Sequence, residues 1–298
     1  MSLSISSCAR ECWRAASLEG QSVSGPWRAH LRLSFQRAGQ LTRLAERRHE
    51  GPLLVQRVFQ PEAADGGPCH VYVLHPPGGV VSGDQLELRV GVQPSARVLI
   101  TTAAAGKFYR SSQPAVSSRV LQSFWIEDGT LEWLPLENIF YPDTSCELAT
   151  CLHLSGSACV IGWEIACLGL PANGLGLGTG ELRQGLEIWR EGQPLLIERF
   201  RLDEQSIAAP WGLAGYRAVG TCVAYPAGAQ LLERARAAAA PLADPTLELA
   251  CTLVDGVLCC RARARRADRI RHAFIGLWHT LRPALLGRFP RPPRIWAT

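Results

Sequence analysis

The chain has 298 residues, of which 47% are hydrophobic and 19% are charged, and its formal net charge is +5. This length is enough to bury a sizeable core, either as one large domain or as two small ones. No apolar run approaches the roughly 20 residues that a membrane-spanning helix needs, so a membrane span is excluded.

The eleven cysteines are irregularly spaced and include no C-x-x-C pair. Such usage indicates free and mostly buried thiols in a reducing compartment, rather than a disulfide framework or a zinc site. Residues 1–27 carry charges through every apolar segment, so they do not resemble a secretory signal. We therefore predict a cytoplasmic protein in which residues 1–27 form a disordered leader.

From residue 28 to about residue 225, short apolar and polar runs alternate between turn residues, which is typical of an all-β domain. Residues 29–35, AHLRLSF, place Leu31, Leu33 and Phe35 on one face of a strand. Residues 84–92, DQLELRVGV, do the same with three apolar side chains. Many strands and few helices are expected in this part of the chain.

Three pairs of strands are predicted to form hairpins, and they occupy residues 118–135, 186–202 and 247–264. The first and third carry Asp-Gly at the predicted turn, as Asp128-Gly129 and Asp255-Gly256. Asp-Gly favours the tight turn of a hairpin because both residues accept positive φ angles.

After Pro226 the pattern changes to include helices. The alanine-rich residues 228–243 predict one helix, and residues 269–281 predict a second with an apolar stripe at helical spacing. The proline-rich residues 287–298 cannot extend that helix, although Ile295 and Trp296 suggest that the tail docks on the domain. The prediction is a mainly β, sandwich-like single domain over residues 28–298 with a small α-containing C-terminal part.

The stretch HPPGGVVSGD, residues 75–84, is rich in glycine and proline and ends on an acid. It lacks the G-x-x-x-x-G-K-[ST] spacing of a phosphate-binding loop, and Gly106-Lys107 is followed by phenylalanine instead of a hydroxyl residue. A hydrolase built on His75, Ser82 and Asp84 remains an alternative, although Ser82 lacks the G-x-S-x-G elbow. The favoured interpretation is a shaped turn whose glycines fix the carboxylate of Asp84.

Two further acids lie in apolar strands. Glu164 is surrounded by apolar residues, and Glu198 shares a strand face with leucine and phenylalanine. A buried carboxylate must be paired, protonated or bound to a cation. Pairing with Arg199, Arg201 or Lys107 is one hypothesis, and transient contact with a metal ion in a polar cavity is the other.

The last forty residues are rich in arginine. The ten arginines concerned are 261, 263, 265, 266, 269, 271, 282, 288, 291 and 294. Solvated strand and helix faces would explain them, and the alternative function is a basic module that binds nucleic acid through this region.

Several long blocks of this sequence together resemble the urease accessory protein UreD family, called UreH in some species. The blocks are GPLLVQRVFQPE (51–62), YVLHPPGGVVSGDQL (72–86), TTAAAGKFYRS (101–111), LEWLPLENIFYPD (131–143), WEIACLGLPANG (163–174), GLEIWREGQPLLIERFRL (185–202) and LWHTLRPALLGRFPRPPRIWAT (277–298). The resemblance covers nearly everything after about residue 28.

The resemblance implies a helicoidal, mostly β fold and a scaffold that is not an enzyme. Such a scaffold binds apo-urease and recruits the accessory protein UreF and the GTPase UreG for nickel delivery. It implies no tightly bound cofactor, a nickel ion held transiently, and no nucleic-acid or membrane partner. The family's channel acids correspond by position to Asp84, Glu164 and Glu198.

Overall fold

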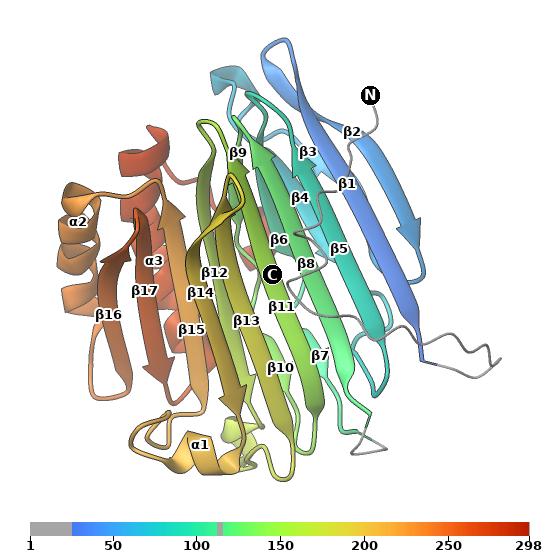
Figure 1. Cartoon of the computed structure of the whole chain (residues 1–298), viewed down its shortest axis with the longest axis vertical. Coiled ribbons are helices and arrows are strands. Elements are labelled where there is room, and N and C mark those ends of the chain that lie inside the picture. The colour runs from blue at the N-terminus through green and yellow to red at the C-terminus, as the bar shows by residue number, and fades with distance from the viewer. Residues whose placement is uncertain (1–25, 112–115, 298) are drawn as a thin grey trace.

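The computed structural model describes residues 26–111 and 116–297 (Figure 1). The first strands are β1 (Arg28–Ala38), β2 (Leu41–Glu50), β3 (Leu54–Phe59), β4 (Cys69–Leu74), β5 (Gln85–Val92), β6 (Arg97–Thr102), β7 (Gly106–Phe108), β8 (Ser118–Glu127) and β9 (Thr130–Trp133). They are followed by β10 (Asn138–Phe140), β11 (Ser145–Ser155), β12 (Cys159–Leu168), β13 (Glu181–Arg190), β14 (Gln193–Leu202), β15 (Ala218–Tyr225), β16 (Leu247–Val254) and β17 (Val257–Ala264). The helices are α1 (Glu204–Ala208), α2 (Ala229–Ala239) and α3 (Ala267–Leu286). The predicted leader lies almost wholly outside the described residues.

The strands form two sheets that pack face to face, as Figure 1 shows. The seven-stranded sheet has the order β14-β13-β11-β8-β5-β1-β2. The ten-stranded sheet has the order β16-β17-β15-β12-β9-β6-β4-β3, with the short β10 paired to β12 and the short β7 paired to β10. The predicted mainly β fold with a small helical C-terminal part is therefore confirmed.

The middle of the chain winds as a helicoid between the two sheets. Strands β5, β8, β11 and β13 are mutually parallel neighbours in the seven-stranded sheet. Strands β4, β6, β9 and β12, which alternate with them along the chain, are parallel neighbours in the ten-stranded sheet. Each coil thus adds one strand to each sheet, and side chains from both sheets meet in the interior.

One predicted hairpin is wrong. The chain does turn at Asp128, which has a φ of 45°, but β8 and β9 belong to different sheets. The Asp128 carboxylate accepts hydrogen bonds from the backbone N–H and the hydroxyl of Ser157, at 2.8 and 2.9 Å. These contacts join the turn to the loop between β11 and β12, and at this turn the chain crosses from one sheet to the other. The hairpins β13-β14 and β16-β17 form as predicted.

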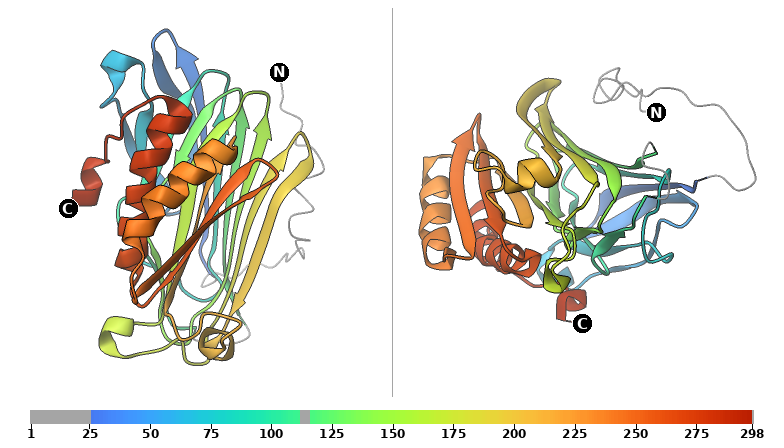
Figure 2. Two further views of the ribbon diagram at one scale, coloured as in Figure 1. Left: turned by 90° about the vertical axis from the view of Figure 1, so that its left-hand side faces the viewer. Right: turned by 90° about the horizontal axis from the view of Figure 1, so that it is seen from below.

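The core has two layers. Between the sheets, the predicted apolar faces of β1 and β5 are buried, including Leu31, Leu33 and Phe35. Figure 2 shows α2 and α3 against the other face of the ten-stranded sheet, where a second apolar cluster is buried. The predicted α3 stripe faces this cluster with Ile270, Ala273, Phe274, Leu277, Trp278 and Leu281, all of which are buried.

The tail after α3 docks on this helical layer. The Trp296 indole packs against Trp163 and Trp278, with ring centroids 5.8 and 5.7 Å apart, and its N–H donates to Thr101 Oγ1 at 3.0 Å. No described helix is long and apolar enough to span a bilayer. The described cysteines are free thiols, and burial raises the pKa of Cys69 and Cys146 to about 12.

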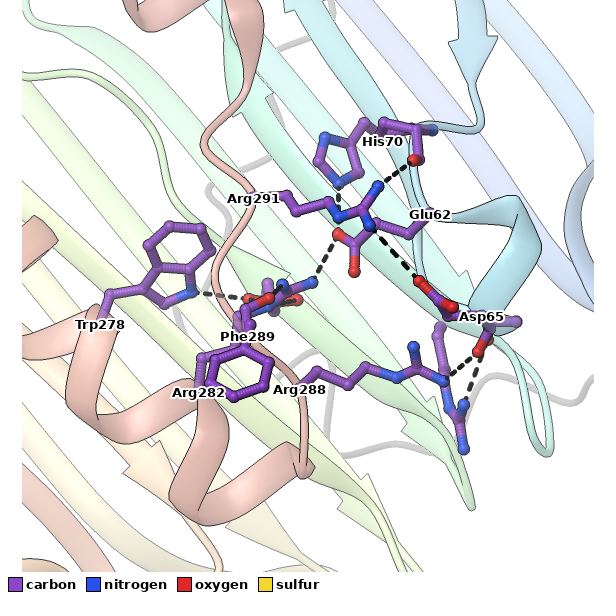
Figure 3. Close-up of polar contacts among 12 residues, drawn as sticks. Glu62, Asp65, His70, Trp278, Arg282, Arg288, Phe289 and Arg291 are labelled. Carbon is purple, nitrogen blue, oxygen red and sulfur yellow. Dashed lines mark hydrogen bonds and ion pairs between the residues drawn. The ribbon is translucent and has the colours of Figure 1, made fainter.

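A buried ionic cluster joins α3 to the ten-stranded sheet (Figure 3). The fully buried Arg282 donates through Nη2 to Glu62 at 2.7 Å and through Nε to both carboxylate oxygens of Glu132, at 3.0 and 3.1 Å. Trp278 donates its indole N–H to Glu132 at 2.7 Å, and His70 Nε2 lies 3.1 Å from Glu62. This Arg282 cluster ties residues more than 200 positions apart into one structural unit.

Replacing Arg282 with methionine should strip two buried carboxylates of their counter-charge. We expect Arg282→Met to lower the free energy of unfolding by about 3–5 kcal/mol, because an unpaired buried charge is costly. The matched control is Arg291→Met, since the Arg291 ion pair with Asp65 is exposed and 3.5 Å long. That control should change stability by less than about 1 kcal/mol in chemical denaturation. Equal effects of the two variants would contradict the assigned importance of the cluster.

Candidate functional site

Asp84 is buried at the end of the glycine-rich stretch, where its carboxylate organises the loop. It accepts hydrogen bonds from the backbone N–H groups of Val81, at 2.9 Å, and Trp27, at 3.0 Å. Gly83, with a φ of +82°, supplies the left-handed turn that allows this closure. The structure therefore supports a shaped turn that fixes Asp84, and no described contact joins Asp84 to Glu164 or Glu198.

The described residues do not assemble the hydrogen-bonded relay of Ser82, His75 and Asp84 that the hydrolase alternative requires. Both Asp84 oxygens are engaged by backbone amides, and Ser82 Oγ lies 2.7 Å from Ser111 Oγ. In the described part of the chain, no hydrogen bond joins His75 to either residue. Burial lowers the pKa of His75, although the nearby Asp84 charge partly opposes this.

Glu164 points from β12 into the space between the sheets. Its carboxyl group bonds Thr150 on β11 and accepts a hydrogen bond from the Gln184 amide on β13 at 2.6 Å. Burial raises the pKa of Glu164 from the ordinary 4.5 to about 7; the bonds from Thr150 and Gln184 oppose that rise, and the Glu198 charge adds to it. Among the described residues, no arginine or lysine pairs with Glu164, so a proton or a cation must neutralise it.

Glu198 reaches from β14 toward the ten-stranded sheet. Thr221 donates its hydroxyl to Glu198 Oε2 at 2.7 Å, and Arg261 on β17 forms an ion pair with Oε1. The predicted partners Arg199 and Arg201 instead pair with Glu187 and Glu181 on the outer face. Because side chains alternate along a strand, residues directly beside Glu198 in sequence point away from it.

These groups form a polar row between the sheets, made of two hydrogen-bonded parts that adjoin where Glu164 on β12 pairs in register with Thr221 on β15. It consists of Gln122, Thr150, Gln184, Glu164, Thr221, Glu198 and Arg261. The Thr150 hydroxyl lies within hydrogen-bond distance of both Gln122 Oε1 and Glu164 Oε1. Because it carries a single proton, it can donate to only one of these oxygens. A protonated Glu164 that donates to Thr150 satisfies both contacts, in agreement with its raised pKa.

The row begins at a cavity of about 460 Å³ beneath the glycine-rich loop. Its lining includes His75, Lys107, Gln122, Trp133 and Asn138. The buried indole N–H of Trp133 has no hydrogen-bond partner among the described residues. A buried donor of this kind is normally satisfied by water or by another polar group. Most of the remaining lining of the cavity is apolar.

The three predicted acids do not form one metal centre. Within residues 26–111 and 116–297, no group of three His, Cys, Asp or Glu side chains could hold a metal ion together. Glu164 and Glu198 lie on the same row, whereas Asp84 belongs to the loop. The sequence reasoning missed Thr150, Gln184 and the other uncharged members, whose only sequence-level indication was a polar side chain on an otherwise apolar strand face.

The arginine-rich C-terminal region is largely engaged within the chain. Seven of its ten arginines form ion pairs with carboxylates of the described residues, namely 261, 263, 266, 269, 271, 282 and 291. Internal pairing therefore explains most of this cluster, and no specific feature favours the nucleic-acid alternative.

The fold and the row define a helicoidal β protein with a polar row inside an apolar core and a helical C-terminal part. The family model of the UreD urease accessory protein matches residues 28–297, and the chain belongs to this family. It is 42% identical to the urease accessory protein UreD of Pseudomonas putida (strain W619), over 91% of this chain and 95% of that protein. It is 40% identical to the proteins of the same name from Enterobacter sp. (strain 638), over 91% and 96%, and from Klebsiella aerogenes, over 91% and 97%.

The raised pKa of Glu164 makes stability depend on pH. Below pH 4.5 both folded and unfolded chains hold the proton, and above pH 7 neither does. Between these values only the folded chain holds it, so the Glu164 contribution to the free energy of unfolding falls by about 3 kcal/mol as pH rises. Glu164→Gln should remove this slope in urea denaturation, whereas Glu181→Gln on the outer face should not. Parallel wild-type and Glu164→Gln curves would show that the pKa of Glu164 is not raised.

Proposed function

We propose that this chain is a non-enzymatic metallochaperone scaffold that helps to insert nickel into urease. The observation that supports the proposal is the interior polar row, which leads from the cavity under the glycine-rich loop to Glu198 and Arg261 at the far side of the sandwich. Family membership supplies the process, since the relatives are named urease accessory proteins.

The chemistry of the row suits a cargo that must be released. Glu164 and Glu198 offer carboxylate oxygens, and their neighbours Thr150, Gln184 and Thr221 offer hydroxyl or amide groups. Oxygen ligands without thiolates hold Ni²⁺ more loosely than a cysteine cluster would, so the ion can move on. At Glu164 the ion would replace a proton, because a carboxylate binds metal in its ionised form.

The same proposal assigns the partners. The scaffold would bind apo-urease and work with UreF and UreG in the cytoplasm, with GTP bound by UreG and not by this chain. Asp84 would act through the loop: by fixing the turn it shapes the wall of the cavity that receives nickel.

Removing either carboxylate of the polar row should impair nickel delivery while the accessory complex stays assembled. We expect Glu164→Ala and Glu198→Ala to reduce urease activation by about tenfold, the scale on which loss of one metal-supporting group acts. Activity is measured in cells at ordinary nickel levels, and complex recovery is followed by co-purification. The control is Glu181→Ala, because Glu181 lies on the outer face in exposed ion pairs with Arg183 and Arg201.

If both Glu164→Ala and Glu198→Ala activate urease as well as the wild type does, these acids have a purely structural role. Deletion of the whole chain tests the broader assignment separately. If urease activity survives the deletion unchanged, the chain has no required part in maturation.

A further inference from the structure

Three arginines converge on one short turn at the edge of the ten-stranded sheet. The turn is the 3₁₀ segment Ala63–Asp65 with the glycine that follows. Arg37 and Arg97 donate to the carbonyl of Gly66, at 3.3 and 3.2 Å. Arg288, from the segment after α3, donates to the carbonyl of Asp65 at 2.7 Å, and Figure 3 shows it beside that residue.

These three guanidinium groups lie close enough for their charges to interact. In the described part of the chain, Arg37, Arg97 and Arg288 form no ion pair with a carboxylate, whereas the nearby Arg282 and Arg291 do. Burial lowers the pKa of Arg97, and the charges of Arg288 and Arg37 lower it further. Like charges that gather without a counter-ion repel one another, so a bound anion would relieve this repulsion.

The backbone is shaped to let the guanidinium groups approach. Gly66 has a φ of +61°, and a Cβ added there would lie 3.2 Å from Arg37 Nη2. A Cβ at Gly67 would lie 3.2 Å from Arg288 Nη1 and closer still to the Glu62 side chain. The two glycines therefore leave the space in which the arginines sit.

A cavity of about 200 Å³ adjoins the cluster. It is lined by Pro68, Arg97, Thr130, Glu132 and Arg288, among others. The volume lies below the ~300 Å³ at which pockets for whole small molecules begin, so it favours a small ion or one group of a larger ligand. The carboxylate in the lining, Glu132, is already paired with the fully buried Arg282.

We propose that Arg97 and Arg288, supported by Arg37, form a binding site for a phosphate-type oxyanion, either inorganic phosphate or a phosphate monoester group. Each of the two lining guanidinium groups has one described hydrogen bond, to a backbone carbonyl, so several N–H donors remain for the ligand. Planar guanidinium forks match the oxygen spacing of phosphate and bind it in pairs of hydrogen bonds. The site lies at the join between the 3₁₀ turn and the C-terminal segment, so its ligand would strengthen that join.

The test is calorimetric titration of the full-length chain with inorganic phosphate and, in parallel, phenyl phosphate, with chloride at matched ionic strength as the reference. We expect saturable binding of at least one phosphate compound and a higher Tm in it than in chloride. Tighter binding of one compound supports the proposal and identifies the free ion or the ester as the ligand. Equal Tm values in phosphate and chloride, with no saturable binding, would overturn it.

The variants locate the site. Arg97→Gln combined with Arg288→Gln should weaken phosphate binding at least tenfold, while Arg265→Gln, which removes one exposed charge outside the cavity, should leave it unchanged. If the double variant does not fold, Arg288→Gln alone serves, since its described side-chain contact is a single bond to the Asp65 carbonyl. Binding that is unaffected by loss of Arg288, or is reduced equally by Arg265→Gln, would refute the assignment.

Discussion

Carboxylates buried between apolar sheets are the constraint on which the rest of this structure depends. A carboxylate that leaves water must be paired, protonated or bound to a cation, and the helicoidal winding decides which of these each acid receives. Glu198 on β14 meets Arg261 on β17 because the edges of the two sheets approach there. Glu164, deeper in the sandwich, meets only hydroxyl and amide groups among the described residues. The same sheets that form the core therefore create two acids with different means of neutralisation.

Much of the fold follows from local patterns. Alternation predicted the buried faces of β1 and β5, and helical spacing predicted the stripe of α3, because burial of one face is a local property of each element. The crossing at Asp128 could not be predicted in this way. Asp-Gly permits a tight turn whether the chain folds back or moves to another sheet, and the parallel partners of β9 are β6 and β12, distant in sequence. Sheet membership is thus a non-local property in a helicoidal protein.

The same contrast between local and non-local properties applies to the candidate site. Glu164 and Glu198 stand out in the sequence because an acid on an apolar strand face requires a special explanation. Their partners do not stand out in the sequence, because Thr150 and Thr221 are ordinary strand residues and Arg261 lies 63 positions from Glu198. The resemblance to UreD identified the acids of interest by position, but only the three-dimensional arrangement separates Asp84, which fixes a loop, from the two acids on the row.

The two buried polar networks differ in how their carboxylates are neutralised. In the Arg282 cluster, one guanidinium group joins two carboxylates with strong hydrogen bonds, so an ion could enter only by breaking them. In the polar row, Glu164 has no cationic partner among the described residues and a pKa of about 7, so near neutral pH it loses or gains a proton at little cost. The proposed role in nickel transfer would use this property, because a carboxyl group must lose its proton before it binds a divalent cation. The Arg282 cluster therefore fixes the helical layer on the sheet, whereas the row contains a carboxyl group, Glu164, that has no cationic partner among the described residues.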